Sequence, residues 1–350
     1  MREAMLYEKL ENGAVRCHVC LWRCKVNRGK HGYCKTRVNL EGTFYTLIYG
    51  VVSSVAVDPI EKKPLFHFFP TSRVLSLGTL GCNFRCNHCQ NWQISYAMHI
   101  GGRWLVEGRR TSHAEALSPE DSVRLAKTHG CVGLAWTYNE PAIWFEHTLD
   151  SARLAKQSGL YTAYVTNGYI TSDGLDAIGP YLDAYRVDVK GFTDEAYGRI
   201  ANLPKGHWRG ILDVAARAKN VAKMHVEVVT NVVPGCNDDS RQLTAIACWI
   251  RDELGADTPW HVTRFHPHAG FGHVPPTPIS SLDAARRTGL DVGLRFVYLG
   301  NVPGADSENT YCYRCGRLAV QRVGYRTALV GIGKGGKCQQ CNADLNVRGI

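Results

Sequence analysis

Cysteine is unevenly distributed along this chain of 350 residues. Of its fourteen cysteines, eleven fall into three groups, within residues 17–34, 82–89 and 312–341. Cysteine makes up about 4% of the residues, which is too little for a secreted disulfide scaffold. In a reducing cytosol, grouped cysteines more often bind metal than pair with each other. We therefore expect a fold that gathers each group around a metal site.

The composition is typical of a globular protein. Hydrophobic residues make up 45% of the chain and charged residues 21%, which excludes disordered and collagen-like classes. No apolar run approaches the roughly 18 residues of a membrane span. The first nine residues are charged and lack the apolar centre of a signal peptide. We expect a cytoplasmic protein that does not contact a membrane.

The net charge of +10 is concentrated in two places. Residues 16–37 carry +7 and residues 312–350 carry +6, and these are the two terminal cysteine groups. Metal-bound thiolates are anionic and would offset much of this charge. The charge alone therefore does not lead us to expect nucleic-acid binding.

Strand-like and helix-like stretches alternate through the middle of the chain. The predicted strands are Arg73–Gly78, Cys131–Thr137, Tyr161–Thr166, Ala184–Val189, His225–Val232, Trp260–Phe265 and Leu294–Leu299. The predicted helices are Pro119–His129, Ala142–Ser158, Trp208–Val221, Ser240–Leu254 and Ser281–Asp291. Such alternation predicts an α/β fold with a parallel sheet, either a full or partial barrel or a doubly wound sheet.

The middle cysteine group directly follows the first predicted strand. Cys82, Cys86 and Cys89 have the spacing Cys-x3-Cys-x2-Cys. Three thiolates can bind three irons of a cubane cluster and leave the fourth iron open, which is how a metal site does chemistry rather than only hold structure. The alternatives are a zinc site with a distant fourth ligand, or a chance spacing in a cysteine-rich chain.

The residues around this group resemble a known family. The segment Gly-Cys-Asn-Phe-Arg-Cys-Asn-His-Cys-Gln-Asn-Trp-Gln-Ile-Ser at 81–95 resembles the signature of radical S-adenosylmethionine (SAM) enzymes. Residues 59–70 and 299–304 resemble the branch of pyruvate formate-lyase activating enzyme homologues and, within it, the AmmeMemoRadiSam-system proteins. The resemblance covers about residues 15–345. It implies a partial (β/α)6-type TIM barrel and a radical SAM oxidoreductase.

The resemblance also implies a chemistry. Cys82, Cys86 and Cys89 would hold a 4Fe-4S cluster, and SAM would chelate the fourth iron. One electron from the cluster would cleave SAM to a 5′-deoxyadenosyl radical, which would abstract hydrogen from an unidentified substrate. The implied partners are SAM, an electron donor such as flavodoxin or ferredoxin, and proteins of the AmmeMemoRadiSam system.

Polar residues at strand ends are the candidates to bind SAM. Asn139 or Glu140 would accept the SAM ammonium, at a place where many relatives carry Gly-Gly-Glu and this chain has no glycines. Asn167 would bind the ribose, and Lys190 and His266 match positions that contact SAM in relatives. All follow predicted strands, and the carboxyl ends of barrel strands are where active sites assemble.

Each of these residues also has a structural alternative. Asn167 precedes a glycine and suits a turn, whereas Glu140 precedes a proline and could begin a helix. Lys190 could be a surface lysine paired with Asp188. His266 lies near His261, His268 and His273, a grouping that could bind zinc but fits no known spacing.

The two terminal groups suggest further metal sites. Cys17, Cys20, Cys24 and Cys34 could bind zinc or a second cluster, although related activating enzymes place extra clusters after the signature. Cys312, Cys315, Cys338 and Cys341 form two Cys-x2-Cys pairs, which favours a zinc-ribbon or rubredoxin-like structural site with Zn²⁺.

The sequence therefore predicts three parts. Residues 1–68 would form a cysteine-rich module with a β-rich lead-in, residues 69–304 the barrel, and residues 305–350 the C-terminal module. Hydrogen abstraction from a small substrate is the first hypothesis for function. Activation of a glycyl-radical enzyme is the second, and a non-enzymatic zinc-ribbon protein that binds nucleic acid is a distant third.

Overall fold

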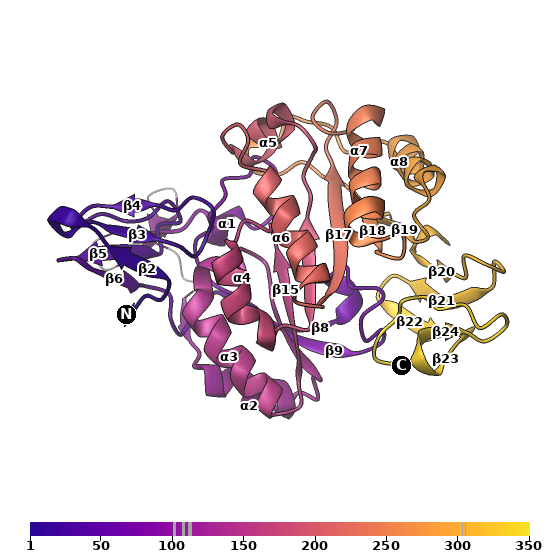
Figure 1. Cartoon of the computed structure of the whole chain (residues 1–350), viewed down its shortest axis with the longest axis horizontal. Helices are drawn as coiled ribbons and strands as arrows, with labels where there is room; N and C mark the ends of the chain where they lie inside the picture. The colour runs from indigo at the N-terminus through magenta and orange to yellow at the C-terminus, as the bar shows by residue number, and fades with distance from the viewer. Residues whose placement is uncertain (101–102, 107–108, 111–113, 303, 305) are drawn as a thin grey trace.

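One large sheet organises the molecule. The computed structural model describes the chain except residues 101–102, 107–108, 111–113, 303 and 305 (Figure 1). The sheet order is β19-β18-β17-β16-β15-β14-β9-β8. Its parallel strands are β9 (Arg73–Gly78), β14 (Gly133–Trp136), β15 (Tyr161–Thr166), β16 (Ala184–Asp188), β17 (His225–Val232), β18 (Trp260–Arg264) and β19 (Val297–Gly300). These seven lie at the positions that the sequence predicts.

The sheet is open, because the strand order begins at β19 and ends at β8 (Ser54–Pro59). β8 pairs with β9 in the antiparallel direction. The prediction of an α/β partial barrel is confirmed, with an antiparallel edge strand that the sequence analysis did not predict.

Helices follow the strands and pack against the sheet (Figure 1). The predicted ones are α2 (Pro119–Thr128), α3 (Phe145–Gln157), α6 (Arg209–Asn220), α7 (Ser240–Trp249) and α8 (Ile279–Val292). The structure adds the shorter α1 (Trp92–Ser95), α4 (Ser172–Ile178) and α5 (Asp194–Ala201). Among the residues described, every helix is too short or too polar to cross a bilayer.

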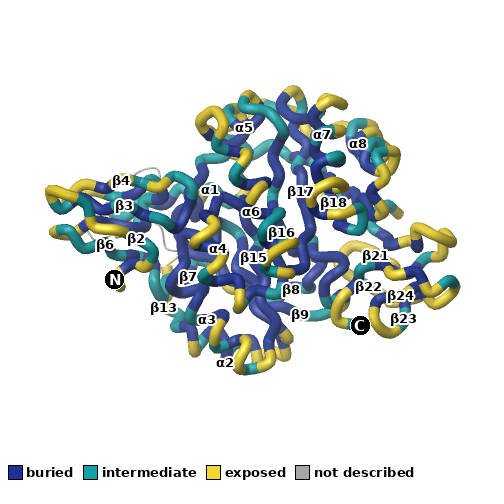
Figure 2. The backbone as a smooth tube through the Cα atoms, viewed as in Figure 1, coloured by how far each residue is buried: buried dark blue, intermediate teal, exposed yellow. Residues whose placement is uncertain are grey.

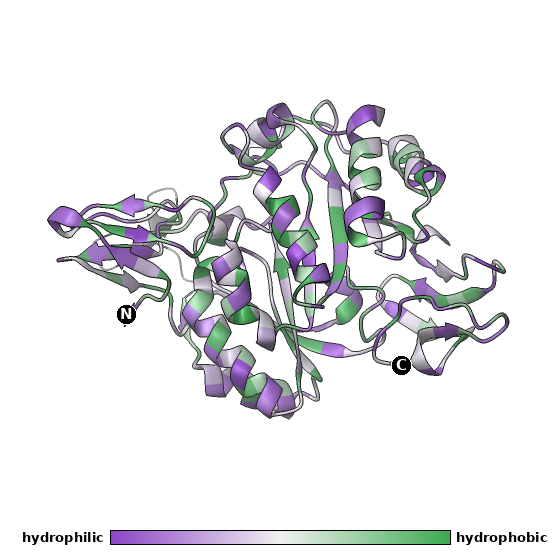
Figure 3. Ribbon diagram, viewed as in Figure 1, coloured by the Kyte–Doolittle hydropathy of each residue, from purple (hydrophilic) through white to green (hydrophobic). Residues whose placement is uncertain are grey.

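The parallel strands are buried on both faces. β14 is buried at all four positions, and dark blue tube runs through the centre of the molecule while exposed segments lie at its periphery (Figure 2). Hydrophobic residues are concentrated on these strands and on the adjoining sides of the helices (Figure 3). Helices therefore cover one face, and the other face encloses the interior of the partial barrel.

The N-terminal residues form two small sheets at one end of the molecule (Figure 1). One has the order β2-β3-β4, the other β1-β6-β5. Their strands are β1 (Arg2–Glu3), β2 (Tyr7–Lys9), β3 (Val15–Cys17), β4 (Lys25–Val26), β5 (Arg37–Leu40) and β6 (Thr43–Thr46). A buried ion pair from Arg37 to Glu146, with the Nη2–Oε2 distance 2.7 Å, joins these sheets to α3.

Further short strands form two small sheets outside the large one. β7 (Val51–Val52) pairs with β13 (Glu115–Ala116). A separate small sheet has the order β10-β11-β12, with β10 (Met98–Ile100), β11 (Arg103–Val106) and β12 (Arg109–Arg110). The four strands β10 to β13 lie in the segment between α1 and α2, whereas β7 precedes α1.

The C-terminal residues form two further small sheets at the opposite end (Figure 1). They consist of β20 (Thr310–Tyr311), β21 (Leu318–Val323), β22 (Arg326–Leu329), β23 (Ile332–Gly333) and β24 (Lys337–Cys338). The buried Arg322 donates to the Phe66 carbonyl oxygen at 2.8 Å, and Phe66 packs in one core with Cys312 and Cys338. The C-terminal module is therefore packed against the partial barrel.

The proposed division into residues 1–68, 69–304 and 305–350 stays a prediction. β8 belongs to the first range by sequence and to the large sheet by pairing. Pro303, within the 299–304 motif, and Ala305, at the second boundary, lie outside the described residues.

Candidate functional site

A cavity of about 400 Å³ opens at the carboxyl edge of the sheet. Its lining comes from the ends of six parallel strands, β14 to β19, from the loop after β9, from residues 62–64 and from Tyr325. The lining residues are Lys62, Lys63, Pro64, Cys82, Cys86, His88, Cys89, Gln90, Asn91, Ser95, Thr137, Tyr138, Asn139, Glu140, Val165, Thr166, Asn167, Arg186, Asp188, Lys190, Val229, Asn231, Thr263, Asn301 and Tyr325. Seven of the eight residues predicted for the cluster and SAM lie there together.

The three signature cysteines line this cavity from one loop. Gly81 has φ +82°, a left-handed conformation that favours glycine, and its amide donates to the Ile94 carbonyl oxygen at 2.8 Å. This turn carries the chain from β9 towards Cys82, whose sulfur accepts from the Phe84 amide at 3.4 Å. Burial raises the pKa of the Cys86 thiol to about 12, so a bound cation would be needed to hold it as thiolate near neutral pH.

The three signature sulfurs are not gathered as tightly as the ligands of a single tetrahedral ion. A tetrahedral zinc ion with Zn–S bonds of about 2.3 Å holds its sulfurs about 3.8 Å apart. Within the described part of the chain, the three signature sulfurs do not all lie within 4.8 Å of one another. A cubane, with irons and sulfides between the ligands, holds cysteines farther apart. The donor set therefore fits a 4Fe-4S cluster with three protein ligands.

Asn139 supports the cysteine loop with its side chain. Its Oδ1 accepts from the Thr79 amide at 3.1 Å, and its Nδ2 donates to the Gly81 carbonyl oxygen at 2.7 Å. The preceding Tyr138 has φ +71°, and the Asn139 amide bonds back to the Thr137 carbonyl, which makes a tight γ-turn. This turn directs the side-chain amide of Asn139 towards the loop that carries Cys82.

Glu140 connects two neighbouring strand ends. Its Oε1 accepts from the Ala142 amide at 2.9 Å and from the Thr166 hydroxyl at 2.7 Å, and its Oε2 accepts from the Asn167 amide at 2.8 Å. Burial raises the pKa of Glu140 to about 7, and these three donors act against that rise. One lone-pair position of Oε2 remains for a donor in the cavity.

Asn167 follows β15 and contacts the cysteine loop. Its Oδ1 accepts from the Tyr169 amide at 2.9 Å, an Asx-type turn, and its Nδ2 donates to Asn83 Oδ1 at 2.8 Å. The turn that the sequence offers as an alternative for Asn167 is therefore present, and Asn167 also lines the cavity.

Lys190 is buried and belongs to a charged group on β16 and just after it. Its Nζ lies 2.9 Å from Asp188 Oδ2, and Arg186 pairs with the other oxygen of Asp188. Burial alone lowers the pKa of Lys190, but the charges of Asp188 and Cys86 outweigh it and raise that pKa. The alternative of a surface lysine is therefore wrong, and its expected pairing with Asp188 is present.

His266 does not join the other predicted residues. It is half-buried in the loop after β18, outside the set of side chains that line the cavity. The zinc alternative for the histidines also fails, because His261 is buried in the sheet and bonds to Glu227 Oε2 at 2.6 Å. Among described residues, these histidines do not form a group with metal-binding spacing.

Several cavity residues were missed by the sequence analysis. His88 lies inside the cysteine signature; burial lowers the pKa of His88 to about 3, and its Nδ1 has no partner among described residues. Arg186 shares a strand face with Asp188, since residues two apart on a strand point the same way, so spacing could have found it. Tyr325 lies in the turn between β21 and β22, and no pattern in the sequence around it indicates a cavity residue.

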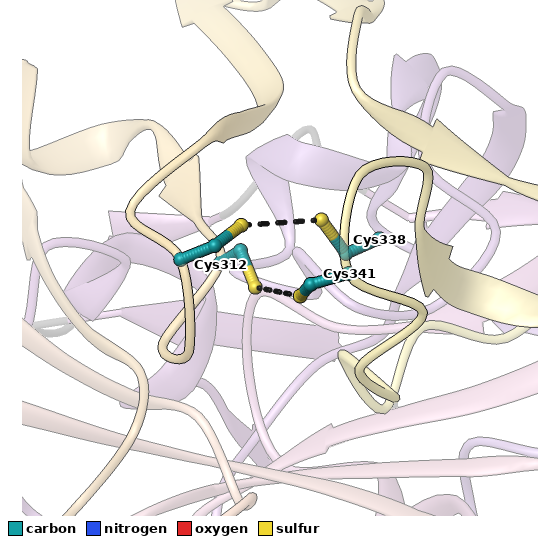
Figure 4. A group of neighbouring side chains, drawn as sticks. Cys312, Cys338 and Cys341 are labelled. Atoms are coloured by element: carbon teal, nitrogen blue, oxygen red, sulfur yellow. Dashed lines mark hydrogen bonds between the residues drawn. The ribbon is translucent and has the colours of Figure 1, made fainter.

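The C-terminal cysteines form a compact group (Figure 4). Cys312 and Cys315 lie between β20 and β21, and Cys338 and Cys341 lie in and after β24. All four sulfurs lie within 4.8 Å of one another, with Cys312–Cys341 at 3.5 Å and Cys315–Cys338 at 3.7 Å. This spacing fits one tetrahedral ion such as zinc.

Comparisons with known proteins agree with this site. The Radical SAM superfamily model matches residues 77–245. An uncharacterised protein of Methanocaldococcus jannaschii is 40% identical over 348 residues, covering 99% of both chains. The isethionate sulfite-lyase activating enzyme of Nitratidesulfovibrio vulgaris is 29% identical over 181 residues, which is 50% of this chain and 57% of that one.

A solved structure, Streptococcus suis SuiB bound to S-adenosylmethionine, aligns with a TM-score of 0.48 at 10% identity, over 63% of this chain and 48% of that one. The family match begins at β9 and includes the cysteine loop and the ends of β14 to β17. The chain belongs to the radical SAM superfamily.

Proposed function

We propose that this chain is a radical SAM oxidoreductase that abstracts a hydrogen atom from a substrate bound in the cavity at the carboxyl edge. One observation carries the proposal: three cysteines from one loop, Cys82 buried and the other two half-buried, line this cavity, with no fourth cysteine among its described lining residues. Cys82, Cys86 and Cys89 would hold a 4Fe-4S cluster. When bound, this cluster and SAM supply one-electron cleavage of SAM and a 5′-deoxyadenosyl radical.

The cavity offers complementary groups for SAM. SAM has an ammonium and a carboxylate on its methionyl part and two ribose hydroxyls. Glu140 keeps a free lone-pair position for the ammonium, and Asn167 lies on the next strand end, within reach of a ribose. Asn139 holds the loop in place and does not bind SAM in this proposal, since both its side-chain groups already bond to that loop.

Lys190 has a supporting role in this proposal. It lies close enough to Cys86 for the two charges to interact, and Asp188 orients its ammonium group. A buried cation beside anionic thiolates lowers the cost of placing their charge in a low-dielectric interior. Lys190 would therefore stabilise the cluster-bearing loop.

The reaction class fits a reducing compartment, and we propose a cytoplasmic protein served by an electron donor such as flavodoxin or ferredoxin. Proteins of the AmmeMemoRadiSam system are the proposed protein partners. Zinc at Cys312, Cys315, Cys338 and Cys341 would hold the C-terminal module, whose Tyr325 lines the same cavity.

The test uses anaerobically purified and reconstituted protein with SAM and dithionite. We expect 5′-deoxyadenosine by mass spectrometry from the wild type and none from Cys86→Ala. Cys248→Ala is the matched control, because Cys248 is a half-buried cysteine on α7 outside all three groups. If Cys86→Ala cleaves SAM as the wild type does, the assignment of this site is wrong.

A second candidate is activation of a glycyl-radical enzyme. The observation in its favour is that 50% of this chain is similar in sequence to the isethionate sulfite-lyase activating enzyme. In this case the hydrogen donor would be a backbone glycine of a partner protein. Anaerobic incubation with a candidate partner, followed by electron paramagnetic resonance (EPR), tests it, and a missing glycyl signal counts against that pairing.

A further inference from the structure

The cavity at the carboxyl edge has lining residues that neither the cluster nor SAM explains. Lys62, Lys63 and Pro64 come soon after β8, and Asn301 directly follows β19. Because β8 and β19 are the two edge strands of the open sheet, these residues line the cavity from both of its edges. Tyr325 of the C-terminal module lines the same cavity. These residues are therefore the candidates to contact the substrate.

Three cations gather in this part of the wall. Lys63 is buried, and its Nζ lies 2.7 Å from Asp58 Oδ2. Lys62 is exposed, and its Nζ lies 2.8 Å from Asp58 Oδ1. Burial lowers the pKa of Lys63, and the charges of Lys62 and Arg186 act in the same direction, so the three cations are close enough to repel one another. We call Lys62, Lys63 and Arg186 the cavity cations.

The carboxylates beside the cavity do not balance these cations. Two carboxylates are each shared by two cations, Asp58 by the two lysines and Asp188 by Arg186 and Lys190. Lys190 lies near the signature thiolates, whose charge can offset its own. The other carboxylate among the described lining residues, Glu140, receives the SAM ammonium in the proposed function. The uncompensated positive charge therefore lies at the cavity cations, where an accompanying anion would lower its cost.

Arg186 keeps donors available for such an anion. Among the described residues, its Nη1 pairs with Asp188, whereas its Nε has no partner. The side chain remains 13% exposed where it lines the cavity. A guanidinium stays charged at any ordinary pH and presents its N–H groups as a planar fork, which matches the two oxygens of a carboxylate or phosphate. Arg186 can therefore bind an anion and keep its bond to Asp188.

The rest of the lining favours a small polar molecule. Of the described lining residues, only Pro64, Val165 and Val229 have aliphatic side chains, although ligand sites are usually mostly apolar. The volume of about 400 Å³ is that of a small-molecule site. Lys63 is buried in the wall, so an anionic group must enter the cavity to approach it. The backbone of a nucleic-acid duplex is too wide to do so.

We propose that the substrate is a small molecule with a carboxylate or phosphate group, and that Lys62 and Arg186 bind this anion. The inference rests on the proposed function, because it names the class of molecule that would donate the hydrogen atom. An anion held at the cavity cations would fix the carbon skeleton between them and the cysteine loop. A backbone glycine of a partner protein carries no such anion.

The experiment titrates two probes, inorganic phosphate and succinate, into the anaerobically reconstituted full chain with saturating SAM and no reductant. SAM occupies its own binding groups, so the probes report the remaining part of the cavity. Calorimetry should give a Kd of about 1 mM or tighter for at least one probe. Tighter phosphate binding supports a phosphorylated substrate, and tighter succinate binding a carboxylated one. Binding of neither probe at about 20 mM would overturn the proposal.

Two variants place the anion at the cavity cations. Lys62→Glu and Arg186→Gln should each raise the Kd of the probe about tenfold or more, because each removes a charge-assisted donor. Asp58 keeps its bond to Lys63 in Lys62→Glu, so this variant decides the question even if Arg186→Gln does not fold. Lys127→Glu, at an exposed position on α2, is the matched control and should leave the Kd unchanged. Equal binding by the wild type and Lys62→Glu would overturn the proposal.

The Kd for SAM and the yield of 5′-deoxyadenosine, measured on the same samples, separate this inference from the proposed function. If SAM is cleaved and neither probe binds, only the substrate class is wrong. If a probe binds and depends on Lys62 while SAM is not cleaved, the anion site is supported and the proposed function fails. If Lys62→Glu weakens the binding of SAM and of the probe by the same factor, Lys62 belongs to the SAM site and the inference is overturned.

Discussion

At the scale of single residues, Glu140 and Asn139 are neighbours with different tasks. Both follow β14 and both were candidates for the SAM ammonium. Asn139 uses its oxygen and its nitrogen on the loop at residues 79–81. Glu140 spans to β15 and retains one free lone-pair position. Sequence position could show that both residues reach the active edge, but only packing shows which one is free to bind.

Glu140 predicts a pH dependence of SAM binding. Its pKa is raised to about 7, so the carboxylate is mostly charged at pH 8 and mostly protonated at pH 6. Since the charged form attracts the ammonium, the Kd for SAM should rise about tenfold as the pH falls from 8 to 6. Equilibrium binding of SAM under anaerobic conditions measures this Kd at each pH. Glu140→Gln should bind more weakly with a flat profile, and a flat wild-type profile would contradict this role.

Asn139→Ala should act through the loop and not through SAM contact. It leaves the Thr79 amide and the Gly81 carbonyl without partners, at a cost of about 1–3 kcal/mol in the free energy of unfolding. We expect lower iron occupancy and an unchanged Kd for SAM in the fraction that holds the cluster. Chemical denaturation checks the free energy of unfolding, and iron analysis checks the iron occupancy. A weaker Kd at full iron occupancy would show direct SAM binding instead.

At the scale of elements, the sequence located all seven parallel strands and missed three short helices, α1, α4 and α5. Of these, α4 and α5 contain Gly174 and Gly198, which weaken a helical pattern. Both begin at threonine caps, Thr171 and Thr193, whose side chains accept an amide three residues on. A threonine three residues before the amide that it caps is therefore the sequence signal from which the start of each of these two helices could have been predicted.

The interior of β17 contains a buried charge that no apolar pattern could predict. Glu227 accepts four hydrogen bonds: from the amides of Phe66 at 3.0 Å and His67 at 2.8 Å, and from the ring nitrogens of His225 at 2.9 Å and His261 at 2.6 Å. Hydrogen bonds from His225 and His261 outweigh burial and hold the pKa of Glu227 well below its usual range. This carboxylate joins β17 and β18 to the segment before β9.

Glu227→Gln should therefore destabilise the sheet strongly. A glutamine amide has two donors and would face groups that are themselves donors, so we expect a loss of about 3 kcal/mol or more. Urea denaturation measures the free energy of unfolding. Glu253→Gln, at an exposed position after α7, is the matched control and should change it by less than about 0.5 kcal/mol. Equal effects of both changes would refute this account.

At the scale of the whole molecule, two small modules flank one partial barrel, and each is tied to it by a few long-range contacts. The grouping of cysteines predicted the modules, because ligand spacing is local in sequence. Their attachment was not predictable, since it depends on pairs such as Arg322 with Phe66. The same reason explains why Tyr325, far along the chain, was not expected in the cavity.

Cys315→Ala tests the role of the C-terminal module. Loss of one of four ligands should release zinc and loosen the core around Cys312 and Cys338, so we expect the Tm to fall by several degrees. SAM cleavage per bound cluster should continue, since Cys315 is not among the residues that line the cavity. Zinc analysis and thermal denaturation check this, with Cys248→Ala as the control. Retention of zinc with an unchanged Tm would contradict a structural metal there.

The buried ion pair between Arg37 and Glu146 has a consequence for synthesis of the chain. Its partners are 109 residues apart, so the small cavity that the four N-terminal cysteines line cannot be completed until α3 has left the ribosome. At about 5–20 residues per second, the four N-terminal thiols remain open to solvent for roughly 5 to 20 seconds. Free thiols in that interval are exposed to oxidation and to competing metals. We therefore expect nascent chains to be most sensitive to oxidation before Glu146 has been made.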